Sequence, residues 1–422
     1  MPIAPRPNPA IVGGMGAKVE RYFIPALVGF APVVFALTTW APVQISPLQA
    51  LILMTALPVV VAELVVIIIA LRSGMLAVLR RSPLPPATAI ALGVWLAIGV
   101  GTSLFVAPAP AISTRWTLHW AVHLGFGFSV TYLAARAFKI RDLVTCYLAG
   151  FVVYVLLFLI FVVTAWHVRA DWVFNLPAAI HIRHVGIYAA AMTGMGIGAM
   201  AQARSRRARA SLIAVTTIGF ALGAWSGSRG MLLSVSAATI LAAVLIPAMR
   251  RPRILVTVAL CMVVGILAIA WLPVPDQQMW GLGREVAATT QHEVTTGRIQ
   301  IWKNVIHAIA RRPWFGYGRG QMPIVAPFFG MGQPHNYILQ ILLSSGVAGL
   351  ACAVVLAFAY LRRAFPVLRD EGERLAAPFT GMMSLLVLSM IDAAMFHVMP
   401  VSIFAACAGM IASAWLPRQS AA

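Results

Sequence analysis

Charged residues are scarce in this chain, and acidic residues are the scarcest. Only 10% of its 422 residues are charged, whereas 61% are hydrophobic and the mean hydropathy is +0.90. Soluble domains have about 25% charged residues, so the composition excludes an ordinary soluble protein. We predict an all-α polytopic membrane protein with about 12 transmembrane helices, because about twelve apolar stretches have the length that crosses a bilayer. Residues 1–422 are expected to form a single integral membrane domain.

The shortage of acidic residues leaves a large positive charge. Against 31 Lys and Arg there are 11 Asp and Glu, which gives a net charge of +20 and a pI of about 11.3. No basic domain stands outside the apolar stretches, so nucleic acid is excluded as a partner. Most basic residues instead fall in one set of loops, as the positive-inside rule describes for cytoplasmic loops. We therefore predict that both termini are cytoplasmic.

Cysteine, metal-binding motifs and internal repeats are few or missing. The four cysteines all fall in apolar stretches, which excludes a disulfide framework or a zinc set. There is no HExxH motif and no outer acidic pair of the DxD type, so we predict no metal and no cofactor. No short apolar region precedes a small-residue cleavage site, so no cleavable signal peptide is expected. The lack of a repeat disfavours an inverted-repeat transporter.

The apolar stretches set the order of the predicted spans. The first nine lie near residues 22–41, 47–71, 87–107, 116–136, 143–165, 185–203, 211–226, 231–248 and 254–272. A tenth begins at His335, and two more follow the charged segment LRRAFPVLRDEGERL. Glu63 lies inside the second span, and we predict that it is buried with a hydrogen-bond partner. Gly194 and Gly198 in the sixth span predict close packing against another helix.

One long outer loop, residues 273–334, separates the ninth and tenth spans. Apolar residues recur within it at helical spacing, which predicts an amphipathic helix over about residues 296–311. The apolar face of this helix contains Ile299, Trp302, Val305, Ile306 and Ile309. Thr295 or Thr296 can cap its start, and Pro313 ends it. We expect the helix to lie along the outer membrane surface with its apolar face down.

Arginines are predicted at the same outer level as this helix. Arg183 lies at the outer start of the sixth span, Arg229 at the outer end of the seventh and Arg298 at the start of the surface helix. A planar guanidinium matches the oxygens of a phosphate, and a cation beside lipid is costly without an anion or water. These arginines therefore suggest a clamp on a lipid-linked phosphate or pyrophosphate. The alternative is that each reaches the lipid headgroups or pairs with an acid such as Asp392.

His335 follows Pro334 at the start of a predicted span. A helix N-terminus disfavours the imidazolium form, which favours a ring that can accept a proton, although a nearby pyrophosphate acts in the opposite direction. Asn336 can orient this ring or contact substrate hydroxyl groups, and Lys303 and Arg319 add cations to the same stretch. The alternative is a histidine that only caps the helix at the interface. We expect interfacial positions for His119, His123, His167, His181, His184, His292 and His397.

Four motifs together resemble the O-antigen ligase and O-antigen polymerase superfamily. They are SGSRG (226–230), TGRIQIW (296–302), GYGRG (316–320) and HNYILQILLSSGVAGL (335–350). The resemblance spans roughly residues 180–350 and implies a metal-independent, inverting membrane glycosyltransferase of the GT-C type. By this resemblance His335 is the catalytic histidine, and Arg183, Arg229 and Arg298 bind the pyrophosphate. Tyr188 and Asn336 are further substrate-binding candidates.

The same resemblance implies the substrates and the compartment. An O-antigen ligase transfers a glycan from undecaprenyl pyrophosphate to a lipid A–core acceptor on the periplasmic face of the bacterial inner membrane. The single large outer loop is typical of a ligase. Three alternatives stay open: a polymerase of the same superfamily, a ligase that glycosylates protein, and a transporter or flippase of lipid-linked glycan. Transport would predict polar residues through the midplane of several spans, whereas here they are concentrated at one outer level.

Overall fold

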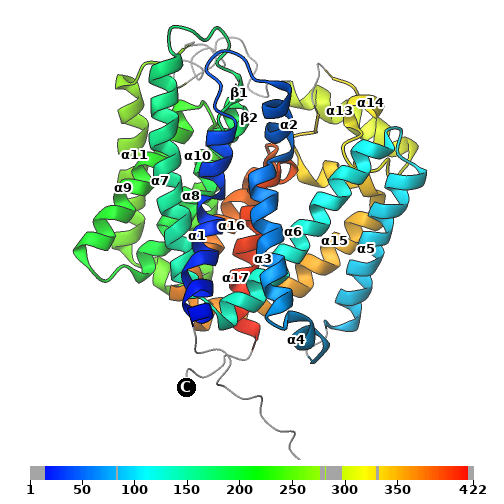
Figure 1. Ribbon diagram of the computed structural model, residues 1–422, viewed down its shortest axis with the longest axis horizontal. Coiled ribbons are helices and arrows are strands. Elements are labelled where there is room, and N and C mark those ends of the chain that lie inside the picture. Colours follow the sequence, from blue (N-terminus) through cyan, green and yellow to red (C-terminus); the bar gives the residue numbers. More distant parts are fainter. Residues whose placement is uncertain (1–14, 82–83, 276–280, 282–296, 329–331, 417–422) are drawn as a thin grey trace, which may run out of the picture.

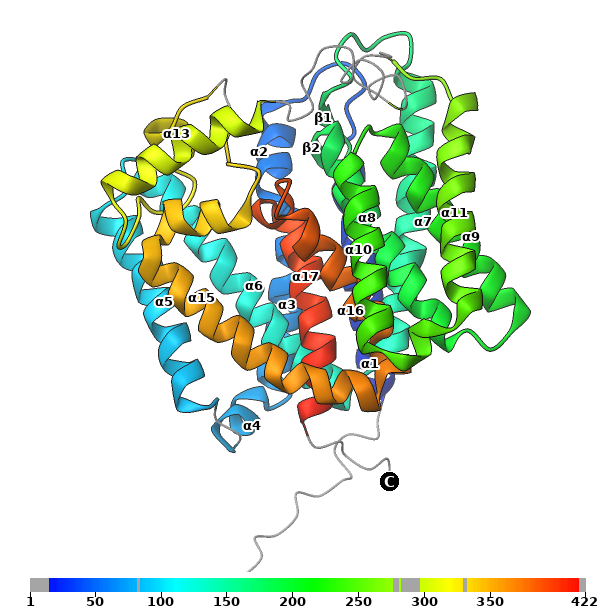
Figure 2. The ribbon, with the colours of Figure 1, turned by 180° about the vertical axis from the view of Figure 1, so that it is seen from behind.

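The computed structural model describes residues 15–81, 84–275, 281, 297–328 and 332–416. Apart from one small sheet, this part of the chain is built from helices that run between the two ends of the molecule (Figures 1 and 2). The first described helix begins, and the last described segment ends, at the same end of the bundle (Figure 1).

The elements follow one another in the order of the predicted spans. The first half of the chain contains α1 (Met15–Thr38), α2 (Pro47–Thr55), α3 (Leu57–Arg72), α4 (Met75–Arg81), α5 (Pro86–Phe105), α6 (Pro110–Arg136), α7 (Ile140–Ala165), β1 (Phe174–Leu176), β2 (Ala179–His181), α8 (Ile182–Ala199) and η2 (Met200–Gln202). The second half contains α9 (Arg206–Trp225), α10 (Arg229–Leu245), η3 (Pro247–Arg250), α11 (Pro252–Ala268), η4 (Ile269–Trp271), α13 (Arg298–Arg311), α14 (Met322–Val325), α15 (Tyr337–Asp370), α16 (Gly372–Leu388), η5 (Ala394–Phe396), α17 (Val398–Ala412) and η6 (Ser413–Trp415).

Seven described helices are long and apolar enough to cross a membrane, or eight if the bent pair α2 and α3 is one span. The prediction of a helical polytopic membrane protein is confirmed. The helices α6, α8, α10 and α16 run alongside these spans but are shorter or more polar, and they complete the predicted order of crossings (Figures 1 and 2). Helices α8 and α16 are buried over most of their length, so their side chains meet protein instead of lipid.

Several predicted boundaries were wrong. The predicted second span, 47–71, is two helices bent by 50°, because Ala56 between them has a left-handed φ of 46°. The fourth begins at Pro110 instead of residue 116. The tenth begins at Tyr337 instead of His335, and it continues into the charged segment LRRAFPVLRDEGERL as far as Asp370. The hairpin of β1 and β2, which pairs Phe174 with His181, lies in a segment predicted as a loop.

Small residues allow α8 and α16 to pack closely at the centre of the bundle. A Cβ on Gly194 would lie 2.5 Å from Oγ of Ser384, and one on Gly198 would lie 2.3 Å from the carbonyl oxygen of Ala376. Thr380 of α16 also donates a hydrogen bond of 2.6 Å to the carbonyl of Gly194. The close packing predicted from these two glycines is confirmed, and it follows the rule that small residues bring membrane helices together.

A break in α15 receives the glycine-rich segment that follows the surface helix. Gly346 has φ 64° and ψ −166°, a conformation open mainly to glycine, and it divides α15 into two helical pieces. The N–H groups of Tyr317 and Gly318 donate to the carbonyls of Leu343 and Ser344, both at 2.9 Å. A Cβ on Gly346 would lie 2.2 Å from the backbone of Trp314. The motifs GYGRG and SSGVAGL therefore fit into one another.

The surface helix exists, but its buried face differs from the prediction. Helix α13 spans Arg298–Arg311, and Gly297, with φ 74°, stands at its N-cap; the threonines expected to cap it lie outside the described residues. The side chains of Ile301, Val305 and Ala308 are buried, whereas Ile299 and Ile306 are half-exposed. The buried face packs on Tyr317, Met322, Ala326 and Leu343, which belong to the following segment and to α15. Of the predicted apolar face, Trp302, Val305 and Ile309 therefore pack on protein, whereas Ile299 and Ile306 are exposed.

Candidate active site

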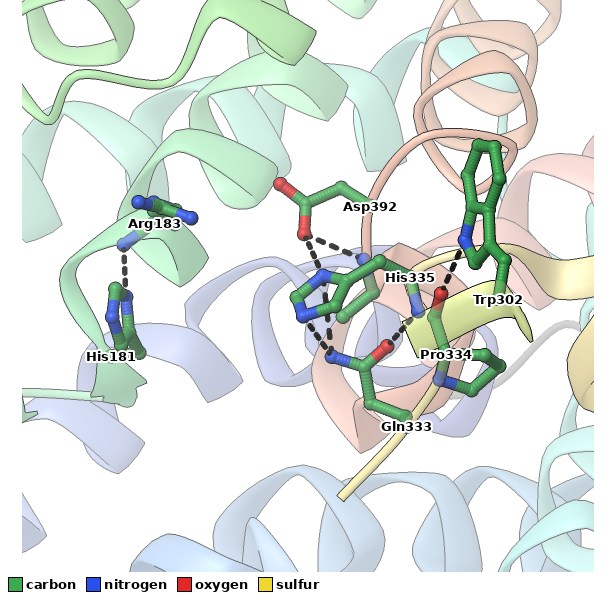
Figure 3. A network of polar contacts seen from close by, with 8 residues as sticks. His181, Arg183, Trp302, Gln333, Pro334, His335 and Asp392 are labelled. Atoms are coloured by element: carbon green, nitrogen blue, oxygen red, sulfur yellow. Dashed lines mark hydrogen bonds and ion pairs between the residues drawn. The ribbon is translucent and has the colours of Figure 1, made fainter. Parts of the chain in front are cut away.

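His335 forms a pair with Asp392 where the start of α15 meets the connection between α16 and α17. The two side chains point toward one another, with Nδ1 of the ring 3.0 Å from Oδ1 of the carboxylate (Figure 3). The same Oδ1 accepts a hydrogen bond of 2.8 Å from the backbone N–H of Ala393. Burial opposes the carboxylate, but His335, Arg298 and Ala393 outweigh it and lower the pKa of Asp392 to about 2. With Nδ1 donating to this anion, Nε2 carries the lone pair that can accept a proton.

The backbone of His335 is held in an unusual conformation. Its φ is 53°, in the left-handed region that residues with a Cβ rarely adopt. Its N–H donates to Oε1 of Gln333 at 2.8 Å, and Nε2 of Gln333 lies 3.3 Å from Nε2 of the ring (Figure 3). The indole of Trp302 in α13 donates to the carbonyl of Pro334 at 2.9 Å. Such strain persists only where neighbours hold it, and it is common at active sites and ligand clamps.

Asn336 is occupied by protein contacts. Its Oδ1 accepts from the N–H of Leu339 at 3.0 Å, which caps α15, and its Nδ2 donates to the carbonyl of Met390 at 3.1 Å. The side chain therefore ties the start of α15 to the connection that carries Asp392. These contacts favour a positioning role for Asn336 over the predicted contact with substrate.

The three predicted arginines each lie in the first turn of a helix. Arg229 and Arg298 are the first residues of α10 and α13, and Arg183 is the second residue of α8. The charges of Asp392, Arg298 and Arg229 all act on Arg183, so the four groups form one cluster. Helix N-termini add partial positive charge and unsatisfied N–H groups to such a cluster. The structure therefore brings together three cations, three helix starts and the carboxylate that holds His335.

The motif SGSRG packs tightly between α8 and the connection that carries Asp392. A Cβ on Gly186 of α8 would lie 2.5 Å from Cβ of Ser228, and one on Gly230 would lie 2.8 Å from Leu388 and 3.4 Å from Ile391. Arg229 stands between these two contact points in the sequence. Its position relative to Asp392 is thus fixed by backbone packing on both sides.

Two other candidates lie away from this cluster. Tyr188 is fully buried in the core, edge-on to Phe151 and Tyr154 with ring centroids 5.4 and 5.1 Å away, so its placement favours a packing role. Lys303 is exposed in the middle of α13, outside the first turn that carries Arg298. The structure does not bring either residue to the His335–Asp392 pair.

Arg319 joins an aromatic cluster. Its guanidinium lies 4.6 Å from the ring of Trp95 and 4.9 Å from the ring of Trp120, and Tyr337 stacks on Trp120 at 6.3 Å. Burial lowers the pKa of Arg319 to about 10, so it stays a cation at neutral pH. Its backbone N–H donates to Oγ of Ser113 at 2.9 Å. These contacts anchor the glycine-rich segment to α5 and α6, instead of placing Arg319 among the other arginines.

Sequence reasoning missed three neighbours of the site. Asp392 was considered only as an alternative partner for arginine, and His184 and His397 were expected to be interfacial. The rings of His184 and His397 lie 3.8 Å apart, and His335 is close enough to influence both electrostatically. Burial lowers the pKa of His397 to about 4, which keeps it neutral. The available signal was a single acid, Asp392, in an otherwise apolar connection between two spans.

The groups at this site are better suited to bind an anion than a metal cation. Among the residues that the structure describes, no group of three or more His, Cys, Asp and Glu side chains is arranged to hold a metal ion. The groups gathered here are guanidinium groups and helix N–H groups, which suit the oxygens of a phosphate.

In this helical membrane protein a histidine–carboxylate pair lies beside clustered arginines, and such a concentration of ionisable groups is typical of functional sites. Residues 212–354, about a third of the chain, match the family model described as O-Antigen ligase. The matched segment contains Arg229, Arg298 and His335, whereas Arg183 and Asp392 lie outside it. This third of the chain is similar to the O-antigen ligase family. No curated protein matches the chain.

Proposed function

We propose that this protein is an O-antigen ligase, which transfers a glycan from undecaprenyl pyrophosphate to lipid A–core. The observation that carries the proposal is the pair His335–Asp392, 3.0 Å apart, beside the cluster of Arg183, Arg229 and Arg298. The pair supplies a base for an incoming hydroxyl, and the arginines supply charge for a departing pyrophosphate. Both are needed to transfer a sugar from such a donor.

The arginine cluster would hold the pyrophosphate and stabilise it as it leaves. Each guanidinium can donate two hydrogen bonds to one phosphate group, and its charge does not depend on pH in the physiological range. The helix starts of α8, α10 and α13 add N–H groups to the same place. Charge that grows on the leaving oxygen is thus met by preorganised donors in a partly buried site, where such donors are most effective.

His335 would act as the general base. As the acceptor oxygen bonds to C1 of the donor sugar, its proton passes to Nε2 of His335. The bond from C1 to the pyrophosphate oxygen breaks, and its electron pair leaves with the pyrophosphate. Asp392 stabilises the imidazolium that forms through its contact with Nδ1. The proton is released from His335 before the next turnover.

This chemistry favours inversion at C1. A retaining enzyme of the double-displacement type needs a nucleophile, usually a second carboxylate, close to the sugar. Asp392 is already engaged by His335 and Ala393, so it is poorly placed for that role. We infer direct displacement without a metal ion, in a site of the GT-C type.

An apolar cavity extends from Trp120 toward the end of the bundle that holds α4, and we infer that it takes part of the polyprenyl chain of the donor. It has a volume of about 270 Å³ and lies between α5, α6, α15 and α17. Trp120 lines it and stacks on Tyr337, two residues after His335. In the bacterial inner membrane we infer that the end with α13 faces the periplasm, because the basic loops lie at the other end.

A reconstituted reaction tests the proposal. Purified protein in liposomes receives undecaprenyl-pyrophosphate glycan and lipid A–core, and the products are separated and identified by mass spectrometry. We expect glycan on lipid A–core. Longer glycan that remains on undecaprenyl pyrophosphate would identify a polymerase instead, and glycan on an added protein would identify a protein-glycosylating ligase. Movement of the donor across the bilayer without formation of a new glycosidic bond would show that the protein is a flippase and not an enzyme.

A further inference from the structure

A large cavity opens at the end of the bundle opposite the candidate active site. It has a volume of about 830 Å³ and lies between α7 and α9, with the end of α8 and the start of α16 behind it. Helix α7 packs against α1, and α9 packs against α8 and α11, which leaves a gap between α7 and α9. In Figures 1 and 2 the two helices stand at the margin of the bundle. Ligand cavities in proteins have volumes of about 300–1,000 Å³, so this space can hold a substantial group.

The cavity has a cationic mouth. Arg141 at the start of α7 and Arg204 before α9 both line it and are exposed. Within the described residues, neither guanidinium forms an ion pair or a hydrogen bond with another group. Ser205, also in the lining, caps α9 by accepting from Ala208, so the positive end of that helix faces the same mouth. The acid in the lining, Glu373, is paired with Arg251 outside it.

The wall behind this mouth is apolar and follows the two helices. Leu148 and Val152 of α7 face Leu212 and Val215 of α9 across the cavity, in each case about one helical turn apart. Thr145 and Ala149 of α7 are exposed at its edge, so the space is open sideways to the surroundings of the bundle.

We propose that this cavity binds one anionic phospholipid, with its phosphate at Arg141 and Arg204 and an acyl chain along the apolar wall. Basic pockets between membrane helices favour anionic headgroups, and the lateral opening gives a lipid access. The inference does not depend on the proposed reaction, since the cavity lies at the other end of the molecule.

Native mass spectrometry of the full-length protein, titrated with dioleoyl phosphatidylglycerol or phosphatidylcholine, tests the proposal. We expect one tightly bound phosphatidylglycerol. The double variant Arg141→Gln/Arg204→Gln should bind it about 20- to 30-fold more weakly, because each basic residue near an anionic lipid contributes roughly a factor of five. The matched control is Arg80→Gln/Arg81→Gln on α4, two exposed arginines outside the cavity lining, which should bind as the unmodified protein does.

A third variant distinguishes binding in the cavity from nonspecific electrostatic attraction of the lipid to the two arginines. Ala149→Trp keeps both arginines but fills the cavity from an exposed position, and it should abolish the tight site. Unchanged binding in this variant, equal loss in the α4 control, or equal binding of phosphatidylcholine would overturn the proposal. So would full displacement of the lipid by millimolar inorganic phosphate, which would identify a site for a free anion, or a dimer that covers the cavity and excludes lipid.

Discussion

Two histidine–carboxylate pairs of nearly the same length lie in the part of the molecule that the structure describes. Nδ1 of His335 is 3.0 Å from Asp392, and Nδ1 of His123 is 2.8 Å from Glu63. The side chains of the first pair are 12% and 6% exposed, whereas those of the second are 3% and 1% exposed. The partner predicted for Glu63 is therefore present, but His123 is buried instead of interfacial.

The surroundings of the two pairs differ more than the pairs themselves. His335 and Asp392 lie in connections between helices, where three arginines start helices nearby. His123 and Glu63 lie within α6 and α3, packed between helices and without an arginine among the contacts recorded for either side chain. A pair of this kind can hold a fold together or prepare a base. Which of the two it does depends on access for a substrate and on cations for its leaving group.

The largest expected effect comes from removing one histidine of each pair. His335→Ala should lower the transfer rate by about 10²–10⁴-fold, because a general base is lost, while the melting temperature changes little. His123→Ala should leave the rate per folded molecule nearly unchanged but cost about 3 kcal/mol of stability, because Glu63 stays buried without its partner. The measurements are transfer rate and thermal unfolding of both variants. Normal transfer by His335→Ala would rule out the base.

The second-largest effect on transfer should come from the arginines beside the His335–Asp392 pair. Arg298→Ala should lower transfer by about 10²–10³-fold, as expected when one preorganised donor to the leaving group is removed, and should also weaken donor binding. Arg298→Lys should recover only part of this, since an ammonium cannot bind phosphate in two places. Lys303→Ala on the exposed side of α13 is the matched control and should transfer normally. Equal losses in both alanine variants would contradict the clamp.

Substitutions of the two carboxylates, Asp392 and Glu63, should differ less in their effect on the transfer rate. Asp392→Asn should lower transfer by about 10–100-fold, because the amide still contacts the ring but no longer stabilises the imidazolium, an effect known for groups that orient a histidine from behind. Glu63→Gln should change transfer less than twofold, because the pair of Glu63 and His123 lies away from the arginines that would bind the leaving group. Rates at saturating donor and acceptor decide between them. If Glu63→Gln lost as much as Asp392→Asn, the proposed division of roles would fail.

Much of the arrangement was predictable from local patterns. Apolar length gave the helical membrane class, and the position of Arg183, Arg229 and Arg298 at predicted span ends gave the cluster that the structure shows. The surface helix was found by its periodicity. Val305 of the predicted face is buried, but Ile299 and Ile306 are exposed, and Ile301 and Ala308, which were not predicted, are buried. Periodicity alone does not reveal that the helix packs on protein, because lipid and protein select the same apolar residues.

The parts that were missed depend on contacts between distant segments. Asp392 lies 57 positions after His335, and nothing near it in the sequence marks a partner. The break in α15 at Gly346 depends on Trp314 filling the space beside it, a contact that no helical pattern encodes. Arg319 was grouped with the other arginines because the sequence does not show that Trp95 and Trp120 enclose it.

A backbone change far from any ionisable group tests how the first pair is supported. Gly346→Ala places a Cβ 2.2 Å from the backbone of Trp314 in a conformation suited to glycine, so it should cost about 1–3 kcal/mol and lower transfer severalfold. The matched control is Gly101→Ala in α5, where nothing lies within 4 Å of the new Cβ; it should leave transfer unchanged and be neutral or slightly stabilising. Thermal unfolding and transfer are measured together. Unaltered transfer in Gly346→Ala would show that the break does not position His335.

Removal of divalent metal ions should have no effect on transfer. This prediction concerns which groups balance the negative charge of the departing pyrophosphate. A pyrophosphate that departs from a sugar needs positive charge near its oxygens, from a divalent ion or from side chains. The cluster of Arg183, Arg229 and Arg298 supplies three permanent charges, partly offset by Asp392, and helix starts add to them. We therefore expect transfer in excess EDTA to equal transfer with added Mg²⁺. A strict requirement for Mg²⁺ would show that arginines alone do not balance the charge, and the sensitivity of Arg298→Ala to Mg²⁺ would then measure how the two share it.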